Sequence, residues 1–264
     1  MRRRDDEAAL LDVAAEMAEV ARVATLRHFR TTGLLADSKE AARFDPVTVA
    51  DREAEAAMRA VLARRRPGDA ILGEEMGPSA GRSGLTWVLD PIDGTRGYLA
   101  GTPTWGVLIA ISDPQGPVYG LIDQPFIGER FEGGFGRARV VGPAGERPLA
   151  CRPARPLSQA ILLSTFPEVG SDEEGASFRR VAGAVRLVRY GMDCYGYALL
   201  AAGQVDLVIE AGLQPYDVAA PIAVIEAAGG IVTDWRGGPC AGGGRVVAAA
   251  NAAVHAAALA LLEG

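Results

Sequence analysis

The sequence predicts an α/β protein whose first half has α+β character, and two observations support that class. Between residues 161 and 262, short apolar runs alternate with segments of helical periodicity, which is typical of helices layered on a sheet. Before that, two helical segments come first and a series of strand-like runs follows them. We therefore expect an α+β half at residues 1–145 and an α/β half at residues 146–264.

Two predicted helices open the first half. Apolar residues recur at helical spacing from residue 7 to about residue 29, and again from residue 48 or 50 to about residue 65, before Pro67 and Gly68. Strand-like apolar runs follow at residues 70–75, 85–90, 105–113, 116–125 and 129–136. The first two runs end in carboxylates, so we expect their ends to point at a site.

A stretch rich in Pro, Gly and Arg at residues 141–156 is the expected junction between the halves. Beyond it we expect strands at residues 161–165, 185–189, 205–210, 231–235 and 246–250. The helices expected between and after them span residues 172–183, 195–202, 218–228 and 252–262.

The bulk composition limits the classes of function. The 264-residue chain is 49% hydrophobic and 23% charged, as in ordinary soluble globular proteins. Its formal charge of −6 gives no basic footprint for nucleic acid, and the short arginine runs at residues 2–4 and 64–66 are expected on solvated faces. The three cysteines lie far apart with no CxxC pair, which indicates neither a disulfide framework nor a zinc site. A cytoplasmic location fits this usage.

Neither a signal peptide nor a membrane span is expected. The N-terminus carries basic residues, but acidic residues interrupt the apolar core that a signal peptide needs. No apolar run reaches the roughly 18 residues that span a bilayer. We therefore expect no membrane partner.

Residues 89–95 read LDPIDGT and follow an apolar run. Pro91 rigidifies the turn, so the side chains of Asp90 and Asp93 and the carbonyl of Ile92 are expected to converge. Hard oxygens of this kind are ligands for Mg²⁺. The Gly-Thr pair that follows opens a predicted helix whose free N–H groups favour an anion. The alternative is that Asp93 caps this helix and Asp90 is a turn residue.

Other carboxylates occur in contexts that favour the metal site. Glu74 and Glu75 close an apolar strand-like run. Asp217 starts an apolar helix, where it could instead be an N-cap, and Asp51 lies early in a helix, where it could instead be a surface acid that stabilises the dipole. Each signal is weak alone.

Four segments together resemble the inositol monophosphatase family. They are DPVTVADREAE at residues 45–55, GEE at 73–75, WVLDPIDGTRGY at 87–98 and PYDVAAPIAVIEAAGG at 215–230, in the order that the family has them. The match covers nearly the whole chain, and the motifs are highly specific in combination. It implies a layered αβαβα sandwich of the inositol monophosphatase and sugar phosphatase type. It also implies a homodimer that is sensitive to lithium and hydrolyses small phosphorylated metabolites.

The resemblance also implies roles for individual residues. Two or three Mg²⁺ ions are expected to be bound by Glu74, Asp90, Asp93, Asp217 and the Ile92 carbonyl. Asp51, Thr95 and Glu74 are implied to be catalytic, with Asp51 and Thr95 activating the attacking water, while the amides of Gly94 and Thr95 bind phosphate. Such a metal-assisted reaction needs neither a covalent intermediate nor a histidine. His28 and His255 accordingly lie on predicted helices of ordinary amphipathic pattern.

Substrate recognition is expected in the second half, which also carries the last metal ligand. Glu210 precedes Asp217 by seven residues, a spacing that the family uses for a substrate-facing acid. After Gly191, where inositol-specific members have small neutral residues, residues 192–194 read MDC. A carboxylate at Asp193 would repel a second phosphate and attract an ammonium or imidazolium group. The alternative is that Asp193 caps the next helix.

These features, with RGYLAGTPTWG and GLIDQPFIGERF, resemble the histidinol-phosphatase branch of the family, which serves histidine biosynthesis. The hypothesis is therefore hydrolysis of L-histidinol phosphate. Its rivals are an inositol-1-phosphate or broad-specificity monophosphatase and a non-catalytic metal-binding regulator.

Two residues depart from the family's pattern or lack a clear role. Lys39 lies further from Asp51 than the lysine that the family has before its PVT segment, so either the loop is longer or Arg43 takes that place. Cys194 has no basic partner in view and is expected to be a small packing residue.

Overall fold

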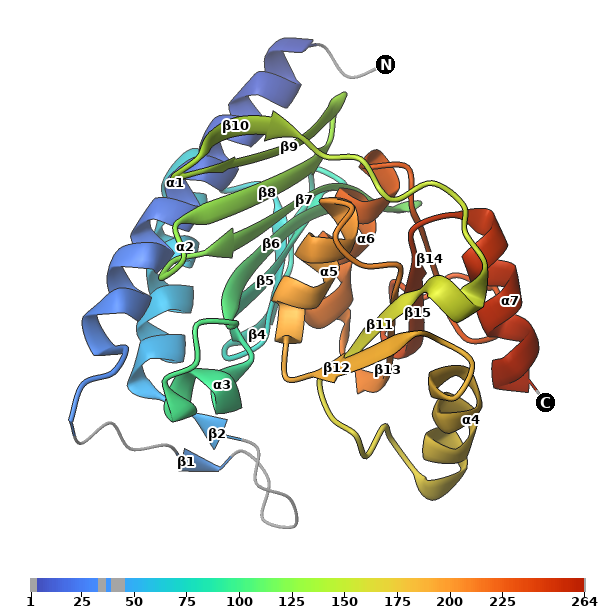
Figure 1. The fold of residues 1–264 in the computed structure, drawn as a ribbon. Helices are drawn as coiled ribbons and strands as arrows, with labels where there is room; N and C mark the ends of the chain where they lie inside the picture. The colour runs from blue at the N-terminus through green and yellow to red at the C-terminus, as the bar shows by residue number, and fades with distance from the viewer. Residues whose placement is uncertain (1–3, 33–36, 39–45, 264) are drawn as a thin grey trace.

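The elements of the protein stack in five alternating layers of helices and sheets (Figure 1). The computed structural model describes residues 4–32, 37–38 and 46–263. The helices are α1 (Arg4–His28), α2 (Val49–Arg65), α3 (Thr95–Ala100), α4 (Asp172–Ala182), α5 (Asp193–Ala201), α6 (Pro215–Ala227) and α7 (Ala252–Glu263). In layer order, α1 and α2 cover the first sheet, α5 and α6 lie between the sheets, and α4 and α7 cover the second.

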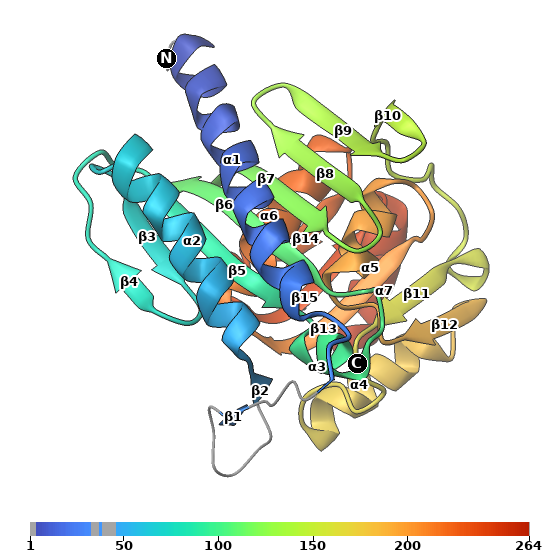
Figure 2. The ribbon, with the colours of Figure 1, turned by 90° about the vertical axis from the view of Figure 1, so that its left-hand side faces the viewer.

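Within the described residues, eight strands form the first sheet in the order β10-β9-β8-β7-β6-β5-β3-β4, with only β3 and β5 parallel. Its strands are β3 (Ala70–Gly73), β4 (Gly77–Ser79), β5 (Thr86–Asp93), β6 (Gly106–Asp113), β7 (Gly116–Gln124), β8 (Glu129–Gly134), β9 (Arg137–Gly142) and β10 (Gly145–Pro148). Figure 2 shows α1 and α2 side by side on the outer face of this sheet.

The second sheet has the order β12-β11-β13-β15-β14, and β11 pairs in parallel with both β12 and β13. Its strands are β11 (Ile161–Ser164), β12 (Leu187–Tyr190), β13 (Leu207–Leu213), β14 (Ile231–Thr233) and β15 (Gly244–Ala249). A short ladder pairs β1 (Asp37–Ser38) with β2 (Pro46–Val47) just before α2.

Successive side chains of β5 point to opposite faces of the first sheet, so this strand contributes to the cores on both faces. Trp87 and Leu89 pack in the cluster beneath α1 and α2, whereas Val88 packs in the cluster that contains α5 and α6. Each such buried apolar side chain contributes about 1.5–3 kcal/mol. Helix α6 approaches the sheet closely at Gly120, where a Cβ atom would lie 2.2 Å from the Ala220 carbonyl oxygen. The face of the first sheet is thereby packed directly against α6, at the interior strand β7.

The layered class predicted from the sequence is confirmed, with shifts at the element ends. Strand β5 runs on through the DPID segment, and α6 begins at Pro215, where a missing N–H costs nothing. Strands β4, β9 and β10 were not predicted, and β10 lies within the expected junction and pairs with β9. The division of the chain at residues 145 and 146 stays a prediction. In the described chain, no helix is both long and apolar enough to span a bilayer.

Candidate active site

The DPIDGT segment bends where β5 leaves the first sheet. Its pairing with β6 is irregular between Asp90 and Asp93, and Asp90 Oδ1 accepts a hydrogen bond from the Ile92 N–H at 3.0 Å. Gly94, at a φ of +85°, turns the chain into α3 without a side-chain cap. The N-cap alternative for Asp93 is therefore wrong, whereas Asp90 is both a turn residue and part of a cluster.

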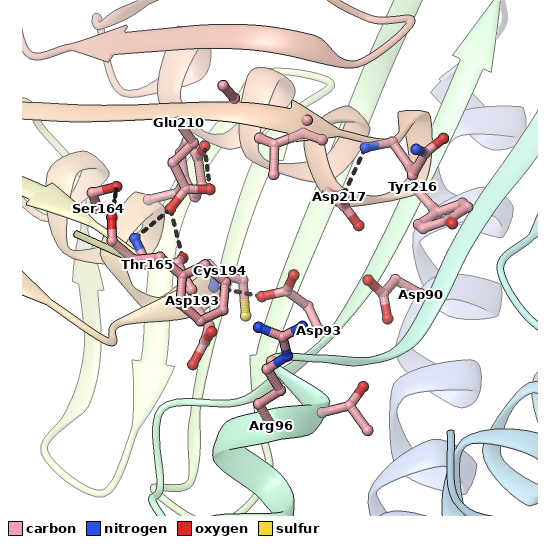
Figure 3. A pocket seen from close by; sticks show the side chains of 18 of the residues that line it. Asp90, Asp93, Arg96, Ser164, Thr165, Asp193, Cys194, Glu210, Tyr216 and Asp217 are labelled. Carbon is pink, nitrogen blue, oxygen red and sulfur yellow. Dashed lines mark hydrogen bonds between the residues drawn. The ribbon is translucent and has the colours of Figure 1, made fainter. Parts of the chain in front are cut away.

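Three carboxylates from two elements converge at this bend (Figure 3). Asp90 and Asp93 come from β5 and Asp217 from the first turn of α6, and one oxygen of each lies within 4.8 Å of the others. Asp93 Oδ2 accepts the Cys194 N–H at 2.5 Å, and Asp217 Oδ2 accepts the Gln214 N–H at 2.7 Å. Asp217 is thus the third residue of its helix in a capping box, not its N-cap.

The carboxylates of the cluster repel one another, and a bound cation would relieve that repulsion. Burial, and then the neighbouring charges of Glu74, Asp93 and Asp217, raise the pKa of Asp90 well above its ordinary value. Burial and the charges of Asp193 and Asp217 do the same to the pKa of Asp93. Crowded carboxylate oxygens with mutual repulsion form the donor set that a hard divalent ion prefers, so the described residues fit Mg²⁺.

Asp51 and Thr95 lie next to the cluster. Asp51 is fully buried and accepts the Thr48 N–H at 2.8 Å and its hydroxyl at 2.6 Å. Thr95 Oγ1 lies 3.4 Å from Asp51 Oδ1 and 3.0 Å from the Ile92 carbonyl oxygen. Burial is the main cause that raises the pKa of Asp51. The surface-acid alternative for Asp51 is therefore wrong.

A pocket of about 440 Å³ opens over these groups. From the first half it is lined by Glu74, Asp90, Ile92, Asp93, Gly94 and Thr95, and from the second by Asp193, Glu210 and Asp217. Two predicted residues do not line it. Asp51 lies behind Thr95, and Gly191 forms the turn before α5, where its N–H donates to the Thr165 carbonyl at 3.0 Å.

Asp193 lies over the start of α3. Its backbone has a φ of +46°, and its carboxylate accepts the Thr104 hydroxyl at 3.2 Å. A Cβ atom on Gly94 would lie 2.7 Å from Asp193 Cγ, so this close approach requires glycine there. Met192 is the N-cap of α5 and no side-chain cap is made, so the helix-cap alternative for Asp193 is wrong.

Glu210 forms the opposite wall of the pocket. Its Oε1 accepts the N–H of Thr165 at 2.9 Å and the hydroxyl of the same residue at 2.6 Å, and its Oε2 accepts the Tyr197 hydroxyl at 3.4 Å. Burial raises the pKa of Glu210 to about 7, although these hydrogen bonds oppose the shift.

Sequence reasoning missed several pocket residues. The guanidinium of Arg96 lies 4.9 Å from the ring centre of Phe166, so the two side chains meet across the pocket between α3 and the loop after β11. Arg96 could have been found as the charged residue that follows DPIDGT, and Thr165 as the polar end of an apolar run. No feature of the neighbouring sequence indicates that Tyr197 or Phe166 lies in the pocket.

The histidines, Cys194 and the basic residues near residue 40 were also singled out from the sequence, and of these only Cys194 lines the pocket among the described residues. His28 contacts Glu53 and His255 contacts Thr233, and neither histidine lines the pocket. Cys194 is buried, as expected of a packing residue, and burial raises the pKa of its thiol. Lys39 and Arg43 lie outside the described residues.

Comparison with known proteins agrees with this geometry. Residues 6–263 match the model of the inositol monophosphatase family. The chain is 44% identical over 229 residues to the bifunctional phosphatase IMPL2, chloroplastic, of Arabidopsis thaliana, covering 83% of this chain but only 65% of that relative. It is 35% identical over 251 residues to the histidinol-phosphatase of Mycobacterium tuberculosis, covering 93% and 94% of the two chains.

Among solved structures, an inositol monophosphatase from Zymomonas mobilis superposes over 100% of both chains with a TM-score of 0.85 and 37% identity. The layered fold, the acidic cluster and the match over nearly the whole length thus agree. The chain belongs to the inositol monophosphatase family of phosphatases.

Proposed function

We propose that this protein hydrolyses L-histidinol phosphate to L-histidinol and phosphate with Mg²⁺. The observation that carries the choice of substrate is the Asp193 carboxylate, which the left-handed backbone and the Thr104 hydroxyl hold inside the pocket. An anionic wall close to the phosphate subsite favours a leaving group that carries a positive charge. L-histidinol, with its ammonium and its imidazole, has that chemistry.

The metal ions would be held by the acidic cluster. Its proposed ligands are Glu74, Asp90, Asp93, Asp217 and the Ile92 carbonyl. When bound, Mg²⁺ neutralises the phosphate dianion, lowers the pKa of a coordinated water and stabilises the departing alkoxide. The amides of Gly94 and Thr95, at the bend into α3, are proposed to donate to the phosphate.

Asp51 and Thr95 are proposed to orient the attacking water, with Glu74 as the third catalytic group. Thr95 Oγ1 can donate to Asp51 Oδ1 and accept from the water, so the water's proton passes to Thr95 as its hydroxyl proton moves to Asp51. The Thr48 amide and hydroxyl hold the other oxygen of Asp51 and fix its direction. The proton therefore ends on the buried Asp51, which becomes neutral, while the negative charge stays with the water oxygen that attacks the phosphate.

Glu210 is proposed to face the leaving group, beside the backbone turn at Gly191. Its Oε1 is saturated by Thr165, whereas Oε2 has one long contact with Tyr197 and can accept a further donor from a substrate. An ammonium or imidazolium group bound between Asp193 and Glu210 would be paired on two sides.

The second candidate is an inositol-1-phosphate or broad-specificity monophosphatase. The 37% identity to the inositol monophosphatase from Zymomonas mobilis favours it. Phosphate release from L-histidinol phosphate and from inositol 1-phosphate, each with Mg²⁺ and with a chelator, separates the two. Metal-dependent preference for histidinol phosphate is expected, and preference for inositol phosphate would overturn the proposed substrate. The homodimer, the lithium sensitivity and the cytoplasmic location stay predictions.

A further inference from the structure

Glu55 is a fully buried carboxylate that the proposed chemistry does not use. It lies on α2 four residues after Asp51, so the two side chains share one face of the helix. A buried charge is costly unless donors surround it, so its partners indicate what holds it there.

Three donors surround the Glu55 carboxylate. Oε2 accepts the Glu75 N–H at 2.7 Å, and Oε1 accepts the Met76 N–H at 3.1 Å. Arg59, whose side chain is 15% exposed, donates from Nε to Oε1 at 2.7 Å. Its two other nitrogens donate to the Gly77 carbonyl and to Ser79 on β4. One ion pair therefore holds both ends of the turn between β3 and β4.

That turn begins with Glu74, which is a proposed metal ligand. The Glu74 N–H donates to the Leu89 carbonyl at 3.1 Å and so extends the β3 and β5 pairing to the residue beside Asp90. Glu55 then binds the next two amides along the chain. Gly73 makes room for it, because a Cβ atom there would lie 2.1 Å from Glu55 Oε1.

We propose that Glu55 is a positioning residue of the metal site: it fixes the backbone after Glu74 so that this carboxylate faces Asp90 before an ion arrives. The inference rests on the proposed use of Mg²⁺. It also gives α2 two roles, since the same helix face holds Asp51 against Thr95 and Glu55 against the Glu74 turn. Groups that orient metal ligands typically change metal affinity 10- to 100-fold when they are replaced.

The test is a Mg²⁺ titration of the metal-free, full-length protein by calorimetry, comparing Glu55→Gln with wild type. Glutamine keeps the shape, but its NH₂ group must face one of the two backbone N–H donors, so one of those bonds is lost. The matched control is Glu53→Gln, on the same helix but partly exposed and paired with Arg27 and His28. We expect the Mg²⁺ Kd to rise about 10- to 100-fold in Glu55→Gln and to stay unchanged in the control.

Two further readouts separate positioning from general destabilisation. Amide hydrogen exchange at residues 75 and 76 is expected to speed up in the metal-free variant, while kcat at saturating Mg²⁺ stays within about threefold of wild type. An unchanged Kd in folded Glu55→Gln would overturn the inference. Absence of Mg²⁺ binding by wild type would instead overturn the proposed function. If Glu55→Gln does not fold, Arg59→Gln replaces it under the same Kd criterion.

Discussion

Replacing Asp193 with Asn removes one negative charge and preserves the size of the side chain. Asn can still accept the Thr104 hydroxyl, and the glycines at 94 and 97 that Asp193 packs against are unaffected. A hydrogen bond between charged groups contributes about 1.5–3 kcal/mol, so its loss corresponds to a fall of about 10- to 150-fold in kcat/KM. That fall is expected for L-histidinol phosphate alone, because inositol 1-phosphate has no cation to pair with Asp193.

The assay is phosphate release at saturating Mg²⁺ with both substrates, run on wild type and on Asp193→Asn. For inositol 1-phosphate we expect an unchanged or slightly higher kcat/KM, since one charge that repels the phosphate is gone. A Mg²⁺ titration serves as the control for an intact metal site. Equal losses with both substrates would show that Asp193 has a structural role, and the reasoning about a cationic leaving group would be refuted.

Three further predictions concern the cluster, the pocket wall and the turn after β3. Asp93→Asn should abolish Mg²⁺ binding and turnover yet raise the Tm of the metal-free protein, because it removes a buried charge next to like charges; a lower Tm would contradict this. Glu210, whose pKa is about 7, ionises as the pH rises, so the KM for histidinol phosphate should fall between about pH 6 and 8. If the KM for inositol 1-phosphate falls in the same way, or if the fall persists in Glu210→Gln, ionisation of Glu210 is not its cause. Gly73→Ala should weaken Mg²⁺ binding at least tenfold by displacing Glu55, as calorimetry can measure.

The fold was predictable where periodicity and turn residues agree. Helix α2, with its apolar spacing and Pro67 just beyond its end, was expected within two residues of its observed bounds. Strands β9 and β10 were missed because they are rich in Arg, Gly and Pro and lie at the exposed edge of the sheet, where no apolar run marks them. Edge strands are specified by pairing with a neighbour, which a single sequence does not display.

The site was predictable as a set of carboxylates, but their environments were not. Asp51 has the sequence context of a surface acid, yet it is fully buried beside Thr48 and the bend at Thr95. From the sequence, Asp193 could have been a helix cap. Its left-handed backbone, which the sequence does not reveal, directs the side chain into the pocket. Arg59 is a local partner of Glu55 on the same helix, but the two amides that Glu55 accepts lie 20 and 21 positions away, so its contact with the turn after Glu74 depends on tertiary structure.

In the proposed function the acidic cluster holds the metal, while Asp193 and Glu210 receive a cationic leaving group. A crystal structure with Mn²⁺, phosphate and L-histidinol tests it most directly. We expect anomalous peaks between Asp90, Asp93 and Asp217, and a nitrogen of histidinol within hydrogen-bond distance of Asp193. Metal peaks elsewhere, or histidinol with both of its nitrogen-bearing groups turned away from the two carboxylates, would contradict it.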